Sequence, residues 1–387
     1  MLNMMGPMVC ALSSRLIIDI AMYFGIFVIV AMALNFQYGN AGIPNMGCAV
    51  QVIVGGFAAS TFTLRTALWL AEQSGEAIKS YASDYDWVYN NPYNVQYVLK
   101  DFLMERPLVG ISLFLLTLAV SLIFGAAIGW VIALPAIRLR AEYLMITLIT
   151  FADASQIIAR NWVPLCGGTM GVYVPNVFAW YPGDRSIILA VITLAIGLVS
   201  FFIFRTMLNS PYGRLMRAIR ENEMTVASVG KDVTRIRNNI LIFASSIIAM
   251  TGTLWAFYGS FVKDSLYQRA LWTYWPWLML ILGGPGNNAG TFLGCALVIS
   301  MRRIIIIYKW FFDQYLFFPV AYFENVLLGL FLIIIMIFRP NGLIPEKLLR
   351  IPGIEYKKLV MDTSSVDWRS ERDKEEVRTL RIKEEEE

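Results

Sequence analysis

Long apolar runs, joined by short polar links, dominate the sequence. The complete runs approach the ~20 residues that a helix needs to cross the hydrocarbon core of a bilayer. They lack the alternation of barrel strands, and lipid offers backbone polar groups no other partner, so they should be helices. The pattern predicts an all-α polytopic membrane protein with about 8–10 transmembrane helices and broken, glycine-rich segments. The runs cover residues 16–36, 48–70, 107–134, 143–159, 186–204 and 239–262, a broken pair at 272–282 and 289–307, and 316–338.

Lys and Arg in the polar links predict sidedness, because cytoplasmic loops carry an excess of these residues. The segment 205–238 holds seven of them against three acids, so we expect it in the cytoplasm. The short link that contains Arg138 and Arg140 should share that side. Residues 66–106 then lie outside, and they are acidic and rich in aromatic residues. This external loop is either an interfacial aromatic belt or a docking surface for an external partner.

The same rule divides the chain into two parts. Residues 1–345 are expected to form a transmembrane domain, and 346–387 a charged cytoplasmic tail. An external N-terminus and an internal tail require an odd number of crossings. The start of the chain carries Arg15 before the first apolar run and no small-residue cleavage site, which favours an uncleaved first helix over a signal peptide.

Composition narrows the function classes. Hydrophobic residues make up 57% and charged residues 16%, below the roughly one-quarter charged share of soluble domains. The chain has no histidine, which excludes Ser-His-Asp triads and histidine metal sites. Its four cysteines lie far apart, which argues against a disulfide scaffold or a zinc ribbon. The net charge of +4 fits cytoplasmic loops beside anionic lipid better than nucleic-acid binding.

Two glycine-rich stretches interrupt apolar sequence, at 39–47 and 283–290. Exposed backbone at membrane depth is tolerated where it lines a cavity or is buried in protein, so paired breaks point to a substrate path. The alternative is a helix–helix turn at the membrane surface. A third glycine cluster, at 167–171, lies in a link that we expect outside.

Acidic residues within the apolar runs are few: Asp19, Asp153 and Glu324. Such charges are costly in a membrane and face the bundle interior or water. Asp19 and Glu324 lie near the ends of their runs. Asp153 is deeper, so it either contributes to a translocation path or makes a structural hydrogen bond between helices.

The cytoplasmic segment 210–230 carries the signature of an amphipathic helix. Ser210 is a good N-cap, Pro211 suits the first helical position, and Gly230 is a stop signal. Apolar residues recur on one face at Leu215 and Ile219. The segment is either a basic helix on the membrane surface or a docking helix for a cytoplasmic partner, with the apolar face as its contact ridge.

At this point the sequence resembles the permease subunits of branched-chain amino acid ABC importers, the LivH/LivM family. The most specific stretch is 213–235, which has the family's G-R, R-A-I-R-E-x-E and G-x-x-V-T-R pattern. Further matches over about residues 20–345 are L-P-A-I-R-L-R at 134–140, F-A-D at 151–153, N-W at 161–162, L-C-G-G-T-M-G at 165–171, L-G-G-P-G at 282–286 and F-R-P-N-G-L at 338–343.

The resemblance implies an importer transmembrane domain that works with a second permease subunit, two ATPase subunits and an external solute-binding protein. This chain has no P-loop motif and should bind no cofactor, so ATP and Mg would lie on the ATPase partner. The implied coupling residues are Gly213, Arg214, Leu215, Arg217, Ala218, Ile219, Arg220, Glu221, Glu223 and Gly230. The implied translocation path comprises Asn35, Gly39, Gly42, Asn45, Asp153, Gly283, Gly284 and Gly286.

The expected function is a plasma-membrane pore subunit, itself no enzyme, for branched-chain or other neutral amino acids. The alternatives are a permease of the same family for urea or short amides, an ion-coupled secondary transporter, and an integral-membrane enzyme. Ion coupling would favour several deep acids, where the runs hold Asp153 alone, and no catalytic cluster is visible. Three features depart from the family pattern: a long external loop, the charged tail, and Gln156 in place of an expected basic residue.

Overall fold

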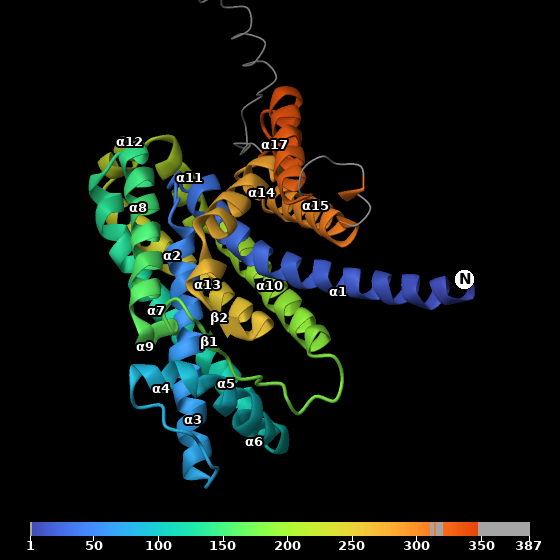
Figure 1. Ribbon diagram of the computed structural model, residues 1–387. Helices are drawn as coiled ribbons and strands as arrows, with labels where there is room; N and C mark the ends of the chain where they lie inside the picture. Colours follow the sequence, from blue (N-terminus) through green and yellow to red (C-terminus); the bar gives the residue numbers. More distant parts are fainter. Residues whose placement is uncertain (1, 310–312, 315–319, 347–387) are drawn as a thin grey trace, which may run out of the picture. The chain divides into compact units, whose positions relative to one another are not determined.

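The computed structural model describes residues 2–309, 313–314 and 320–346, and they belong to one compact unit. The expected tail over 346–387 lies outside this part except for Glu346. Figure 1 shows the arrangement of the helices. The first half of the chain contains α1 (Leu2–Leu34), η1 (Asn35–Gly39), α2 (Cys48–Phe57), η2 (Ala58–Thr63), α3 (Leu64–Gln73), α4 (Asp84–Tyr89), α5 (Asn91–Tyr93), η3 (Asn94–Val98), α6 (Leu99–Glu105), α7 (Pro107–Arg138), α8 (Ala141–Asn161) and α9 (Val163–Cys166).

The second half contains two short strands that pair antiparallel, with Val172 opposite Val262 and Tyr173 opposite Phe261. Its elements are β1 (Val172–Tyr173), α10 (Arg185–Asn209), α11 (Pro211–Glu221), α12 (Glu223–Ser228), α13 (Val233–Gly259), β2 (Phe261–Val262), η4 (Asp264–Tyr267), η5 (Ala270–Tyr274), α14 (Trp275–Gly283), α15 (Asn288–Ile307) and α17 (Val320–Phe338).

Over the described residues, each predicted apolar run is helical along all or most of its length, which confirms the all-α fold class. Within the described residues, seven helices are long and apolar enough to cross a membrane. The runs 272–282 and 316–338 give shorter helices, because α14 has nine residues and the apolar stretch within α17 covers Asn325–Phe338. The spans are Arg15–Gly39, Cys48–Gln73, Pro107–Ala136, Ala141–Asn161, Arg185–Asn209, Val233–Gly259 and Asn288–Ile307.

Helix α13 lies at the centre of the bundle, packed against α2 and α7. Small residues permit this contact, as is typical of membrane helices. A Cβ atom on Gly55 would overlap the carbonyl oxygen of Ala249, and one on Gly252 would overlap that of Val52. Gly125 and Gly129 of α7 likewise face α13 without room for a side chain. We call Gly55, Gly125, Gly129 and Gly252 the glycine seam.

The described part of the chain contains four π-helical segments: η1, η2, η3 and η5. The segment η2 lies within the long helical span Cys48–Gln73, between α2 and α3. A cavity of about 470 Å³ lies beside it, and its walls include Phe57, Ala58, Phe62, Phe124 and Ile128. π-segments inside α-helices frequently occur at functional sites.

The external loop, residues 66–106, folds after α3 into the short helices α4, α5 and α6 (Figure 1). Asn91 fastens the loop to strand β1, because its amide oxygen accepts a hydrogen bond from Tyr173 N at 2.6 Å and its Nδ2 donates to Tyr173 O at 3.3 Å. Trp87 is buried, whereas Tyr85 and Tyr89 stack on each other in solvent. The exposed rings fit both interpretations of the loop, the interfacial belt and the docking surface.

Candidate functional site

The amphipathic segment begins as the sequence predicts. Ser210 Oγ accepts a hydrogen bond from Tyr212 N at 3.2 Å, and Pro211 occupies the first turn of α11. The expected single helix is wrong, however, because the chain breaks at Asn222 into α11 and α12. The Asn222 side chain accepts from Thr225 N at 3.1 Å and so caps a new helix instead of continuing the first one. Gly230 follows α12 with a positive φ of 78°.

The apolar face of α11 packs inside this chain. Ile219 is buried in a small cluster with Val226 and Val233, against which Leu215 and Ile236 also pack. The idea that Leu215 and Ile219 form a free docking ridge is therefore wrong for the chain as folded here. A periodic apolar face predicts burial, yet it does not identify the neighbour that covers it. The exposed positions of this segment include Arg214, Ala218, Glu221 and Glu223, together with Met224 and Val229.

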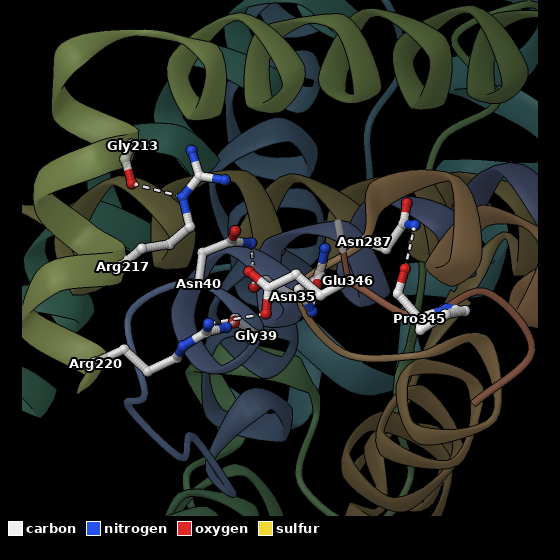
Figure 2. A network of polar contacts seen from close by, with 10 residues as sticks. Asn35, Gly39, Asn40, Gly213, Arg217, Arg220, Asn287, Pro345 and Glu346 are labelled. Carbon is white, nitrogen blue, oxygen red and sulfur yellow. Dashed lines mark hydrogen bonds and ion pairs between the residues drawn. The ribbon is translucent and has the colours of Figure 1, made fainter. Parts of the chain in front are cut away.

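Arg217 fixes α11 to the end of α10. Its Nε donates to Gly213 O at 3.3 Å and its Nη2 donates to Leu208 O at 3.2 Å. A Cβ on Gly213 would overlap the Leu208 carbonyl oxygen, so glycine permits this close turn. Figure 2 shows the Arg217–Gly213 contact on the same helix as Arg220.

Arg220 joins α11 to the break in α1. Its Nη1 donates to the carbonyl oxygen of Gly39, and its Nη2 forms an ion pair with Glu346 at 2.8 Å (Figure 2). The Arg220 side chain also covers Gly42, which has a positive φ of 71°. The predicted coupling segment and the first glycine-rich break are therefore in direct contact.

Asn35 brings the two glycine-rich breaks together. Its Oδ1 accepts from Gly286 N at 2.8 Å, and its Nδ2 donates to Asn288 Oδ1 at 2.8 Å. A Cβ on Gly39 would collide with both Asn35 Oδ1 and Gly286 N. We call Asn35, Gly39, Arg220, Gly286 and Glu346 the junction. It unites η1, α11, the α14–α15 loop and the segment after α17.

The α14–α15 loop is held by the chain that follows α17. Leu343 N donates to Leu282 O at 3.0 Å, and Ile344 N donates to Gly283 O at 3.1 Å. Gly284 has a φ of 107°, and a Cβ there would lie 2.5 Å from Ile344 O. Both observations explain why glycine occupies this position.

Asn45 is buried near η1 and is fully engaged. Its Nδ2 donates to Gln37 Oε1 at 2.9 Å, and its backbone oxygen accepts from Trp277 Nε1 at 3.0 Å. The Nε2 group of Gln37, although buried, lacks an acceptor among the described residues. A buried amide donor without a partner is costly, so this group is available to a polar ligand.

Asp153 makes none of these contacts. Its Oδ2 forms an ion pair with Arg269 Nη1 at 2.5 Å, while on the same helix Arg160 Nε pairs with Asp264 Oδ2 at 2.9 Å. The sequence pattern does not identify Arg269, Asp264 or Glu346 as site residues. The 263–269 link holds two basic residues and one acidic residue between apolar runs, but nothing in the local sequence indicates their partners.

Comparisons with known proteins agree with this architecture. A family model described as the permease component of branched-chain amino acid transport systems matches residues 16–336. A probable branched-chain amino acid transport permease protein LivM of Methanocaldococcus jannaschii is 32% identical over 91% of this chain and 99% of its own length. No solved structure matches.

Two bacterial relatives match a smaller share. The high-affinity branched-chain amino acid transport system permease protein LivM of Salmonella typhimurium is 26% identical over 57% of this chain and 55% of its own length. The protein of the same description from Escherichia coli is 25% identical over 59% and 56%. The family match, together with the seven candidate spans, makes the chain a multi-pass integral membrane protein. It belongs to the branched-chain amino acid transport permease family.

Proposed function

We propose that this permease forms, with a second permease subunit, the pore of an ATP-driven importer of branched-chain amino acids in the plasma membrane. Two ATPase subunits would bind ATP and Mg on the cytoplasmic side, and an external binding protein would deliver the amino acid. The names of the relatives support the substrate, because all three are described as branched-chain amino acid permeases. The excess of Lys and Arg in 205–238 supports the sidedness.

The observation that carries the coupling mechanism is the hydrogen bond from Arg220 to Gly39 O. It supports direct transmission from α11 to the broken end of α1. Arg217 fastens the same helix to the end of α10, so a displacement of α11 would pull on α1 and α10 together. These two helices also meet at Gly25, which lies against Thr193 and Leu194. Closure of the ATPase pair would thereby change the angle at which the two helices cross.

The exposed side chains of α11 and α12 are the proposed contacts with the ATPase. Arg214, Ala218 and Glu221 lie on the open face of α11, and Met224 is 83% exposed. An exposed methionine surrounded by charged residues suits an apolar pocket with a polar rim. Glu223 pairs with Arg237 of α13 at 2.9 Å, so its proposed role is to orient α12.

The junction and its neighbours are the proposed constriction of the path. The hydrogen bonds between Asn35 and the Gly286 region would close the path at the α11 end in this conformation. When the Asn35 hydrogen bonds break, the unpaired Nε2 group of buried Gln37 would donate a hydrogen bond to a substrate carboxylate. Gly283 and Gly284 would hold the loop in place beside the path, because their backbone lies against the backbone of Gly290 and Ile344 without room for a side chain.

Removal of the Arg220 guanidinium tests the coupling. Arg220→Ala should reduce ATP-dependent leucine uptake at least about tenfold while an ATP-binding subunit still co-purifies with the tagged chain, because Arg220 contacts its own chain. Arg235→Ala removes an exposed charge from the same cytoplasmic segment and should leave uptake near the wild-type rate. Equal uptake by the Arg220→Ala variant would refute the role of this contact. A wild-type complex that takes up urea or acetamide but not leucine would refute the proposed substrate.

A further inference from the structure

Helix α8 carries an acidic residue at membrane depth, Asp153, which pairs with Arg269 of the 263–269 link. Asp153 lies twelve residues beyond Ala141 in a 21-residue helix, which is about 18 Å along the helix axis. An ionised carboxylate at this depth must be paired or must face a polar cavity. Arg269 supplies the partner at 2.5 Å and is the one partner of this carboxylate among the described residues.

A second ion pair joins the same two segments in a different way. Arg160 and Asp264 also connect α8 to the 263–269 link, and the Asp264 side chain is only 4% exposed. Gln156 strengthens this connection, since its Nε2 donates to Asp264 O at 3.3 Å. A buried, fully engaged carboxylate of this kind is a structural tie between α8 and the link.

The two pairs differ in the exposure of their carboxylates. The Asp153 side chain is 47% exposed and that of Asp264 is 4% exposed. Both arginines, in contrast, reach the surface, Arg269 at 30% and Arg160 at 56%. The Arg269 guanidinium lies 5.6 Å from the ring centre of Tyr274, which is itself exposed. Because the buried Asp264 carboxylate already ties the segments, the accessible Asp153 carboxylate is not needed for that purpose.

We propose that Asp153 and Arg269 bind the head group of an α-amino acid, an inference that rests on the proposed function. The Asp153 carboxylate accepts hydrogen bonds from the α-ammonium group, and the Arg269 guanidinium donates to the α-carboxylate. The two ligand charges are joined through a single carbon, so they fit a pair of protein charges that already lie together.

The exchange conserves charge at every stage. One internal ion pair opens and two ion pairs to the ligand form, so no uncompensated charge is left in a low-dielectric region. The long Arg269 side chain can swing away while Asp153 stays fixed on α8. Apolar side chains beside the pair, at Ile157 one turn further along α8 and at Tyr274, can cover the branched tail.

Ligands that lack one of the two charges show whether Asp153 and Arg269 bind the head group or only stabilise the fold. The measurement is competition against radiolabelled leucine uptake by the complete importer, with 4-methylpentanoate, which lacks the ammonium group, and 3-methylbutylamine, which lacks the carboxylate. Asp153→Asn should weaken inhibition by unlabelled leucine at least about tenfold relative to inhibition by 4-methylpentanoate. Arg269→Gln should weaken inhibition by unlabelled leucine by a similar factor relative to inhibition by 3-methylbutylamine. Arg160→Gln, the matched control, leaves the buried Asp264 carboxylate without its ion pair and should lower the yield of complex without changing the ranking of ligands.

A charge exchange covers the case in which single variants fail to assemble. The double variant Asp153→Arg, Arg269→Asp keeps an ion pair and should assemble, yet it should still transport L-leucine poorly because the two head-group positions are reversed. Wild-type uptake by this variant, or single variants with an unchanged ligand ranking, would overturn the binding site while leaving the importer in place. Absence of leucine uptake by the wild-type importer would instead overturn the proposed function.

Discussion

The glycine seam and the junction are two places where segments far apart in sequence meet most closely, and they use opposite chemistry. In the seam, backbone lies directly on backbone, with the α-carbons of Gly55 and Gly252 against carbonyl oxygens of the facing helix. In the junction, side chains such as Asn35 and Arg220 reach across to backbone groups. The seam offers no atoms that can rearrange, whereas each junction contact can be exchanged for another hydrogen bond.

This difference indicates which parts of the permease move. Close backbone packing loses its attraction when the helices separate even slightly, so α2, α7 and α13 should move as one body. A hydrogen bond from a flexible side chain can open for a small net free energy, about 1 kcal/mol. The junction should therefore open and close within a frame that the seam holds constant.

The strongest test of the seam is Gly252→Leu. The added side chain would overlap the backbone of α2 at Val52, and overpacking of this kind costs about 3 kcal/mol or more. We expect little folded protein and a melting temperature well below that of the wild type. Gly259→Ala on the same helix is the control, because a Cβ there meets nothing within 4 Å. A normal melting temperature for Gly252→Leu would mean that the seam is loose.

The junction should respond differently to Asn35→Ala. This change leaves Gly286 N and Asn288 Oδ1, both partly buried, without their partner, at a cost of about 1 kcal/mol for each lost hydrogen bond. We expect the complex to assemble with a modestly lower melting temperature, while leucine uptake falls about tenfold. A loss of assembly equal to that of Gly252→Leu would contradict the distinction between frame and moving part.

A smaller effect is expected from Glu346→Gln. Its ion pair with Arg220 is about one-quarter exposed on both sides, so solvent screening limits its contribution to stability to about 1 kcal/mol or less. Uptake should fall about two- to threefold, and high salt should produce a similar fall in the wild type. Glu142→Gln, which removes an exposed carboxylate from the first turn of α8, is the control and should leave the salt dependence unchanged.

Cys166 offers the least perturbing probe of the frame. It is fully buried, and desolvation raises the pKa of its thiol to about 11, above the ordinary value of 9.0. In a variant whose other three cysteines are replaced by alanine, maleimide labelling of Cys166 should therefore be negligible at pH 7–8 and should increase as the pH approaches 11. Since the folded pKa is raised, the thiol's contribution to stability is present below pH 9 and is lost as the pH rises through 11. Rapid labelling at pH 7 would mean that this region opens.

The positions of the helices were easier to predict from the sequence than the contacts between distant segments. Each apolar run predicted a helix because burial in lipid acts on every residue of the run. The break at Asn222 was missed because its side chain competes with the helix only through a local cap. The partners of Arg220 and Asp153 were missed for another reason. Glu346 and Arg269 lie more than 100 positions away, and charge pattern along one segment says nothing about such distant neighbours.

The amphipathic pattern of α11 illustrates the same limit. It correctly indicated that Ile219 is buried, yet α12 and α13 of this chain cover it. The glycine positions were more informative, because a residue without a side chain restricts what can lie beside it. Gly39 and Gly286 were both proposed as path residues from sequence, and the structure places them in contact. Their role in transport stays a prediction.

The π-segment η2 has a consequence for the phase of its helix. Each residue of an α-helix turns the side-chain direction by about 100°, and a π-segment accommodates one extra residue without leaving the axis. Deletion of one residue from Ala58–Thr63 should thus restore an unbroken α-helix while rotating everything beyond it. Arg65 would turn away from the Trp87 ring, now 4.7 Å from its guanidinium carbon, and buried Leu68 would turn toward lipid. The extra residue thus sets how far the second half of the span is rotated relative to the first, so that each half faces its own neighbours.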